Sequence, residues 1–392
     1  MVFLILMKII RSSKCSIKYT TISKQKQIRN ILNEYKNAVN YFINLFWEIP
    51  IEKKDLLKDI VNSANSWITH RMKKVAAREA IDMINCSRAL VEEKRQKLLD
   101  KSEQAETEKE KNKLIANAKN LKPKKPKHHG KRMCLLSTVA ELQTPKDSSF
   151  DSWLHLYSVG NKMSIDIPVK FHRHYRKLSA KGKRLNYYIV TDKEIQFCFE
   201  IETGPKKERK QTVGIDTGVK TLATLSTGEE YGKDIEEIVK RINRCKHGSK
   251  RQQSLRNSLK QRMNEVSKEI TQREDIDCVV VEKLFQMNKN SKKKRSKSKQ
   301  FRKVIGTWAY RYWLDKTQMN CEENRIFFRL VYPHYTSVKC SSCGHTDKRN
   351  RKTRDIFDCL RCRHIDKADK NAAVNIRDRF LTGPYGAGFK PL

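Results

Sequence analysis

Four cysteines near the carboxyl end constrain the fold of this chain more than any other feature. They form two Cys-x-x-Cys pairs separated by fifteen residues: Cys340, Cys343, Cys359 and Cys362. This spacing is typical of a zinc ribbon, and four thiolates complete a tetrahedral zinc site with no open position for a catalytic water. We therefore predict a structural zinc site in residues 340–362. The alternatives are two chance pairs, or one cysteine replaced as a ligand by His345 or His364.

The remaining cysteines are scattered singly, which favours a reducing compartment over a framework of disulfides. The first residues, MVFLILMKII, are apolar, but a segment of about 20 such residues is needed to span a bilayer. They also lack the small-residue cleavage site of a secretory signal. We interpret this start as a β-strand and expect a cytoplasmic protein, associated with the nucleoid if the source is a bacterium.

Positive charge is the second constraint. Lys and Arg total 84 against 44 Asp and Glu, which gives a formal net charge of +40 spread along 392 residues. A polyanion would relieve this self-repulsion, because basic side chains that neutralise its phosphates release condensed counterions. A membrane surface also attracts basic charge, but the sequence has no recognisable basic amphipathic helix with a lipid anchor. The charge therefore predicts a nucleic-acid partner.

Hydrophobic periodicity divides the chain into three regions. From Gln25 apolar residues recur every three or four positions, and helical composition continues to about Asn120. Four runs typical of strands follow, and they predict a small antiparallel sheet or barrel: WLHLYS, MSIDIPV, LNYYIV and IQFCFEI. After a basic linker, strands alternate with helices as in an α/β domain. A basic loop, NKNSKKKRSKSKQFRK, interrupts this last region.

Three acidic residues stand at the ends of predicted elements in the last region. Asp216 ends the strand TVGID, Glu282 closes VVVE, and Asp369 precedes KNAAVNI. Taken singly, Asp216 would be a turn residue, Glu282 the first solvated residue after a strand, and Asp369 a helix N-cap. Taken together at one sheet edge, they would need a divalent cation to offset their repulsion, and oxygen ligands suit Mg²⁺ or Mn²⁺. Two such ions about 4 Å apart catalyse phosphodiester displacement.

Five stretches resemble, in this order, the signature motifs of the TnpB family of transposon-encoded nucleases and of their compact type V CRISPR relatives: GIDTGVKTLATLSTG, VVVEKL, HYTSVKCSSCGH, FDCLRC and DKADKNAAVNI. The resemblance covers residues 212–380, and the amino-terminal half matches only in layout. It implies a RuvC-like RNase H fold with an inserted zinc ribbon, and a nuclease guided by a bound RNA that cuts DNA beside a short flanking motif. The family's three catalytic acids fall on Asp216, Glu282 and Asp369.

The resemblance and the periodicity together predict an α+β multidomain protein. A helical recognition domain is inserted in a small wedge-like or OB-like β domain, which the RuvC-like domain and its zinc ribbon follow. The expected ranges are 1–20 and 121–205 for the β domain, 21–120 for the helical domain, 206–339 and 363–380 for the RuvC-like domain, 340–362 for the ribbon, and 381–392 for a tail. The expected partners are a guide RNA, double-stranded target DNA and its displaced strand, with Mg²⁺ or Mn²⁺ and Zn²⁺ as cofactors and no membrane. Oligomeric state stays open, with a monomer favoured.

Two positions depart from the family's pattern. Arg363 and His364 follow the last zinc cysteine, where many family members have glycine, so the tip of the ribbon is expected to differ. Asp366 is a second candidate for the third acid, although the spacing to Asn371 favours Asp369.

Three alternative functions stay open. The first is a compact type V CRISPR effector, which shares the fold, the acids and the zinc site with the transposon-encoded nucleases. The second is a guide-bound repressor that occupies DNA without cleaving it; the loss of an acid would be its sign, and all three acids are present. The third is a guide-independent nuclease that recognises DNA shape.

Overall fold

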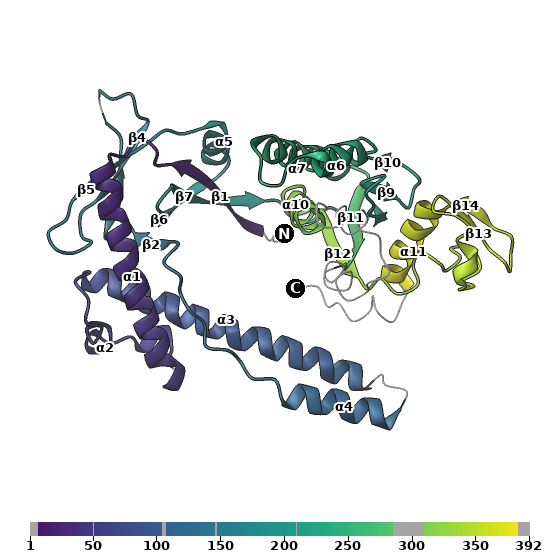
Figure 1. Cartoon of the computed structure of the whole chain (residues 1–392), viewed down its shortest axis with the longest axis horizontal. Helices are drawn as coiled ribbons and strands as arrows, with labels where there is room; N and C mark the ends of the chain where they lie inside the picture. Colours follow the sequence, from purple (N-terminus) through teal and green to yellow (C-terminus); the bar gives the residue numbers. More distant parts are fainter. Residues whose placement is uncertain are drawn as a thin grey trace, which may run out of the picture. The chain divides into compact units, whose positions relative to one another are not determined.

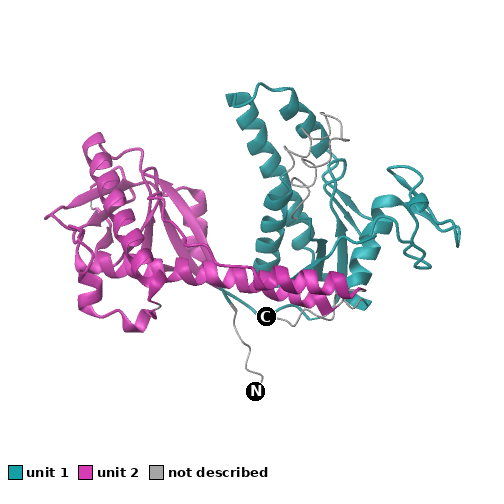
Figure 2. Ribbon diagram, turned by 60° about the horizontal axis from the view of Figure 1, so that its bottom comes forward, with its two compact units in different colours: residues 1–9, 202–392 teal, residues 10–201 magenta. Residues whose placement is uncertain are grey.

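The computed structural model describes residues 7–49, 51–103, 107–145, 147–208, 210–284 and 309–382. The basic loop predicted at 288–303 and nearly all of the tail predicted at 381–392 lie outside these residues. The chain forms two compact units (Figure 2), the amino-terminal unit Ile10–Ile201 and the carboxyl-terminal unit Glu202–Leu392 with Met1–Ile9. None of the described helices combines the length and the apolar character needed to cross a membrane.

Helices make up the first half of the amino-terminal unit (Figure 1). They follow the strand β1 (Met7–Ser16) in chain order: α1 (Ile22–Glu48), α2 (Lys58–Asn62), α3 (His70–Glu103) and α4 (Glu108–Lys119). The predicted periodicity sets the buried face of α1, where Ile28, Ile31 and Tyr35 are fully buried. Thr21 caps this helix by accepting a hydrogen bond from the backbone N–H of Lys24 at 3.4 Å.

Two separately hydrogen-bonded sheets complete the amino-terminal unit, whereas the sequence predicted one small antiparallel sheet or barrel. The first has the order β1-β7-β6-β2, and the second the order β3-β4-β5. Their bounds are β1 (Met7–Ser16), β2 (Met133–Leu136), β3 (Ala140–Gln143), β4 (Ser152–Leu156), β5 (Ile165–Val169), β6 (Lys183–Val190) and β7 (Glu194–Thr203), with α5 (Arg173–Lys181) before β6. The first six residues of the predicted first strand lie outside the described residues; from Met7 the strand is confirmed, and it continues through a stretch of mixed polarity to Ser16.

The carboxyl-terminal unit is built on a mixed five-stranded sheet with the order β10-β9-β8-β11-β12. β8 and β11 are parallel, as are β11 and β12, whereas β9 is antiparallel to both of its neighbours. The strands are β8 (Gln211–Asp216), β9 (Ala223–Leu225), β10 (Glu230–Tyr231), β11 (Ile276–Glu282) and β12 (Phe327–Val331), and the helices are α6 (Ile235–Arg244), α7 (Lys250–Thr271), α10 (Tyr310–Glu323) and α11 (Ala368–Thr382).

The two faces of this sheet carry different helices, because successive side chains of a strand point to opposite faces. Val213 and Val279 belong to a large apolar core that they share with residues of α6, α7 and α10. Cys278 and Val280 point the other way and pack with Ile376 of α11. By the same alternation, Asp216 at the end of β8 and Glu282 at the end of β11 lie on the α11 face.

Residues 340–367 form a small excursion between β12 and α11. It contains the 3₁₀ turn η2 (Lys348–Asn350) and the antiparallel pair β13 (Ile356–Asp358) and β14 (Ile365–Lys367). β14 runs directly into α11, which begins at Ala368. Asp369 therefore lies within the first helical turn, and its interpretation as an N-cap was wrong.

Candidate metal centres

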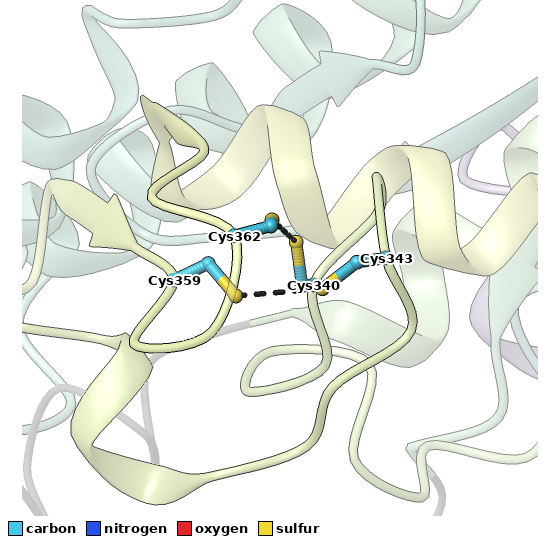
Figure 3. A group of neighbouring side chains, drawn as sticks. All are labelled: Cys340, Cys343, Cys359 and Cys362. Atoms are coloured by element: carbon cyan, nitrogen blue, oxygen red, sulfur yellow. Dashed lines mark hydrogen bonds between the residues drawn. The ribbon is translucent and has the colours of Figure 1, made fainter.

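The four predicted zinc cysteines converge in the carboxyl-terminal unit (Figure 3). The Sγ atoms of Cys340 and Cys362 are 3.6 Å apart, as are those of Cys343 and Cys359. All four ligand atoms lie within 4.8 Å of one another. Sulfurs bound tetrahedrally at a Zn–S distance of about 2.3 Å are separated by about 3.8 Å, so this donor set fits a zinc ion. Neither His345 nor His364 belongs to the group.

Each Cys-x-x-Cys pair forms the same backbone turn. The N–H of Cys340 donates to the carbonyl of His345, and the N–H of Cys359 donates to that of His364, both at 2.9 Å. The turns close through a left-handed residue, which is Gly344 in the first and Arg363 in the second, with φ of 76° and 59°. The sequence led us to expect a different tip at Arg363. The backbone at Arg363 has the left-handed conformation that Gly344 has in the first turn, and the difference from the tips of family members stays a prediction.

The two cysteine turns are joined by Asn350, a fully buried residue of η2. Its Nδ2 donates to the carbonyls of Val338 and His345 at 3.0 and 3.1 Å. Its Oδ1 accepts from the N–H of Leu360 at 3.1 Å. One side chain therefore satisfies backbone groups of both turns, and these bonds hold the two halves of the metal site together without the metal.

Two asparagines of α11 bind the first cysteine turn to the sheet domain. Asn371 accepts from the N–H of Ser341 and donates to the carbonyl of Lys339, both at 2.9 Å. Asn375 donates to the carbonyls of Thr336 and Lys339 at 2.9 and 2.7 Å. Residues four apart share a helix face, so one face of α11 holds the cysteine turn while another packs on the sheet.

The three predicted acids come from three elements that meet at one end of the sheet. Asp216 is the last residue of β8, Glu282 the last of β11, and Asp369 the second of α11. β8 and β11 are parallel with Ile215 opposite Val281, so both strands end at the same edge. Asp216 and Glu282 leave that edge on the face that α11 covers.

Burial and the proximity of other acidic groups disfavour the charged forms of these carboxyl groups. Burial, followed by the charges of Glu282 and Asp369, raises the pKa of Asp216 to about 8. Burial also raises the pKa of Glu282, against the hydrogen bond from the Thr336 hydroxyl and the charge of Arg379. A bound cation would favour the charged carboxylates and so remove the cost of burying them.

Arg351 supplies positive charge beside two of these acids. Its Nη2 lies 3.1 Å from Oδ1 of Asp369, and its charge lowers the pKa of Asp216. The three carboxylates are more widely spaced than the cysteines, since they do not form a group within 4.8 Å among the described residues. Next to them, the buried hydroxyl of Thr217 has no hydrogen-bond partner in the described part of the chain. Asp366, the second candidate for the third acid, pairs with Lys370 at 3.3 Å instead.

Sequence reasoning missed the residues that support both centres. Arg351 lies in a segment rich in basic residues, and nothing local distinguishes it from its neighbours. Asn371 and Asn375 were treated as part of a motif and given no role. The available signal was that the two asparagines are four residues apart on the helix that carries Asp369, and so share one face. Buried asparagine side chains need hydrogen-bond partners, so this face would be expected to bind another segment.

Comparisons with known proteins were consistent with these features. The family model described as "Cas12f1-like, TNB domain" matches residues 310–376, which include all four cysteines and Asp369. A TnpB-like protein of Aquifex aeolicus is 28% identical over 130 residues, which cover 33% of this chain and 41% of that protein. The CRISPR-associated endodeoxyribonuclease Cas12f2 of a Micrarchaeota archaeon is 28% identical over 236 residues, covering 53% and 42%. The matches thus span less than half the length of either relative.

Solved structures share the fold across nearly the whole chain. The mini-RNA-guided endonuclease CRISPR-Cas_phi3 aligns with a TM-score of 0.54 at 10% identity, covering 98% of this chain and 93% of that one. CasPhi-2 (Cas12j), solved bound to crRNA and phosphorothioate DNA, aligns with a TM-score of 0.51 at 10% identity, covering 96% and 92%. At these identities the likeness concerns the fold alone.

The mixed α+β fold is thus shared with the CasPhi structures, and the four-cysteine centre lies within the region that the TNB-domain model matches. In sequence, the chain is similar to TnpB-like proteins and to the compact Cas12f endodeoxyribonucleases, as the motifs predicted.

Proposed function

We propose that this protein is an RNA-guided DNA endonuclease of the TnpB-like kind, which cleaves DNA beside a short flanking motif. In this proposal the carboxyl-terminal unit is a RuvC-like nuclease domain with an inserted zinc ribbon. The amino-terminal unit combines a wedge-like β domain with a helical recognition insertion. The net charge of +40 fits a protein that holds a guide RNA and target DNA mainly by their backbones.

The observation that carries the proposal is the arrangement of Asp216, Glu282 and Asp369 at one end of the sheet, under α11. Three carboxylates from separate elements, with a strongly raised pKa at Asp216, suit a site that binds hard divalent cations. The unpartnered hydroxyl of Thr217 offers one more oxygen beside them. We therefore assign two Mg²⁺ ions to the three acids. Such ions, when bound, activate a water and stabilise the leaving oxygen of a phosphodiester displacement.

The chain's own side chains prepare this site in defined ways. Thr336 donates its hydroxyl to Oε1 of Glu282 and so orients that carboxylate. Arg351 pairs with Asp369, and in this proposal its guanidinium also binds a phosphate oxygen of the substrate. The zinc ribbon performs no chemistry, because its four ligands leave no open position; it braces α11 through Asn371 and Asn375.

The closest alternative is a compact type V CRISPR effector, and the Cas12f relatives favour it as specifically as the Aquifex protein favours a TnpB-like nuclease. Sequencing the RNA that co-purifies from the native host separates the two. A transcript of a transposon end supports the TnpB-like function, and a repeat-derived RNA supports the CRISPR effector. A protein that carries no discrete RNA yet still cleaves DNA would be a guide-independent nuclease, contrary to our proposal.

Cleavage by acid variants tests the mechanism. Asp216→Ala and Asp369→Ala should abolish Mg²⁺-dependent cleavage of guide-matched DNA while leaving RNA binding nearly intact. Asp366→Ala, three residues from Asp369 but paired with Lys370, is the matched control and should keep cleavage. If the acid variants lost RNA binding to the same degree as cleavage, the acids would not serve cleavage alone, contrary to the proposal. If the wild-type protein bound matched DNA without cutting it, it would be a guide-bound repressor.

A further inference from the structure

The α6–α7 hairpin contains a hollow that none of the centres above uses. It lies where the last turn of α6 meets the first turn of α7, and its volume is about 740 Å³. Four of its lining side chains are basic: Arg241, Arg244, Lys246 and Arg251. Glu237 is the acidic residue among those that line it. We refer to this feature as the basic hollow.

The basic side chains of the hollow form no ion pairs or side-chain hydrogen bonds in the described part of the chain, although Glu237 is among the lining residues. Elsewhere on the hairpin, Lys240 pairs with Glu236, and Arg262 pairs with Asp234 and Glu269. A concave cluster of unpaired cations is costly by itself, since like charges repel, and this cost is relieved when an anion occupies the hollow.

The fold explains how the four cations come together. Arg241 and Arg244 are three residues apart on α6 and so share a face, while Lys246 lies in the connection and Arg251 in the first turn of α7. Cys245 fixes the end of α6, since its Sγ donates to the carbonyl of Arg241 at 3.4 Å. The first fully buried apolar residue of α7 is Leu259, and Leu255, which packs against the edge of the core, also lines the hollow, so the hollow lies at the margin of the core.

We propose that the basic hollow binds the sugar–phosphate backbone of a nucleic-acid strand, at a site separate from the three acids. This proposal rests on the proposed function, in which the carboxyl-terminal unit binds nucleic acid. Arginine guanidinium groups bind phosphate oxygens through paired hydrogen bonds, and three of them converge here. The hollow lacks exposed aromatic rings among its lining residues, so it binds backbone and does not read bases.

The test compares two triple variants in buffer with chelator, where cleavage plays no part. The hollow variant carries Arg241→Gln, Arg244→Gln and Arg251→Gln. The control variant carries Lys240→Gln, Lys260→Gln and Lys268→Gln, which remove the same charge from the same two helices outside the hollow. The probes are an RNA–DNA heteroduplex of about 20 base pairs, the corresponding single-stranded RNA, and a DNA duplex of equal length.

Salt dependence of binding gives the first readout. Each phosphate contact contributes about 0.7 to 0.9 to the slope of log affinity against log salt. With at least one probe, we expect the magnitude of this slope to be smaller by about 2 to 3 for the hollow variant than for the wild type. The probe that shows the decrease identifies the bound strand as RNA or DNA. The control variant should lose less. Equal losses in the two variants would overturn the proposal.

Alkylation of Cys245 gives the second readout, because its partly exposed thiol lines the hollow. Bound probe should slow the modification of Cys245, followed by mass spectrometry, in wild type and control but not in the hollow variant. Unchanged modification of wild-type Cys245 at saturating probe would also overturn the proposal. Thermal melting of each variant shows whether it is folded, and wild-type cleavage in Mg²⁺ tests the proposed function independently of either readout.

Discussion

The carbonyl oxygen of Ala373 in α11 approaches Gly214 in β8 so closely that a β-carbon at Gly214 would lie 2.1 Å from it. The same β-carbon would lie 2.6 Å from the backbone nitrogen of Arg377. Both obstacles are backbone atoms of a helix, which cannot turn aside as a side chain can. The helix that carries Asp369 therefore reaches the sheet only because β8 has no side chain two residues before Asp216.

Gly214→Ala should displace α11 and separate Asp369 from the other two acids. We expect a loss of about 3 kcal/mol in the free energy of unfolding, as for other overpacked interiors, and a greater loss in cleavage than this destabilisation explains. Differential scanning calorimetry and Mg²⁺-dependent cleavage measure the two effects. Gly204→Ala is the matched control, because the nearest atom to its β-carbon is the mobile Nη1 of Arg325. Normal activity of Gly214→Ala would show that the packing tolerates the shift.

The raised pKa of Asp216 predicts how stability depends on pH when divalent ions are absent. The folded protein retains this proton up to about pH 8, whereas the unfolded chain releases it near the ordinary value of 3.8. The folded state thus binds more protons between these limits, so the contribution of Asp216 to stability falls as the pH rises through them. Asp216→Asn removes this contribution to the pH dependence.

We therefore expect the melting temperature of Asp216→Asn, measured in EDTA, to rise relative to wild type between pH 5 and pH 8. Added Mg²⁺ should stabilise the wild type more than the variant, because the ion binds the charged carboxylates. Asp366→Asn serves as the control and should follow the wild type. A constant difference between Asp216→Asn and wild type across this range would contradict the pKa shift.

Arg363 occupies a left-handed backbone conformation that favours glycine. Arg363→Gly should relieve a backbone strain of about 1 kcal/mol in the second cysteine turn, partly offset by the greater freedom of glycine in the unfolded chain. We expect slower loss of zinc to a chelator, read with a colorimetric indicator. Gly344→Ala, at the equivalent position of the first turn with φ of 76°, should have the opposite effect. Faster zinc loss from Arg363→Gly would mean that the arginine side chain itself stabilises the turn.

Asn371→Ala should weaken the zinc centre and the acid centre together. The change leaves the N–H of Ser341 and the carbonyl of Lys339 without this partner, and each lost buried hydrogen bond costs about 1 to 3 kcal/mol. We expect faster zinc release and a higher Mg²⁺ requirement for cleavage. Asn257→Ala, on the exposed surface of α7, controls for the substitution itself. An effect on zinc without any effect on the Mg²⁺ requirement would show that the two centres are independent.

Local spacing was sufficient to predict the cysteine centre, because both pairs and their turns are encoded within a few residues. The strand that VVVE closes was also predicted, and the structure confirms it as β11, with every residue of Ile276–Glu282 buried. The acids required more. The alternation of side chains along a strand places Asp216 and Glu282 on one face of the sheet. The sequence alone does not show that α11, which carries Asp369, covers this face and not the other.

The remaining features depend on contacts between distant residues. Nothing in the sequence indicates that Arg351 reaches Asp369, because other basic residues surround it. The turn at η2 places its guanidinium beside the carbonyl of Arg354 and the carboxylate of Asp369. The strands of the amino-terminal unit were recognisable singly, but their division into two sheets depends on pairing across long intervals, such as β1 with β7. The basic hollow likewise needs a hairpin to bring α6 and α7 side by side.

The asparagine bonds between α11 and the first cysteine turn have a consequence for efforts to miniaturise this protein. The ribbon is an attractive segment to delete, because it performs no chemistry and its ends, at β12 and α11, belong to the sheet domain. Deletion would nevertheless remove the Ser341 partner of Asn371 and separate Arg351 from Asp369. A shortened version would need replacements on α11 that restore its rigidity, and the ribbon is better treated as the outer wall of the acid site than as a removable accessory.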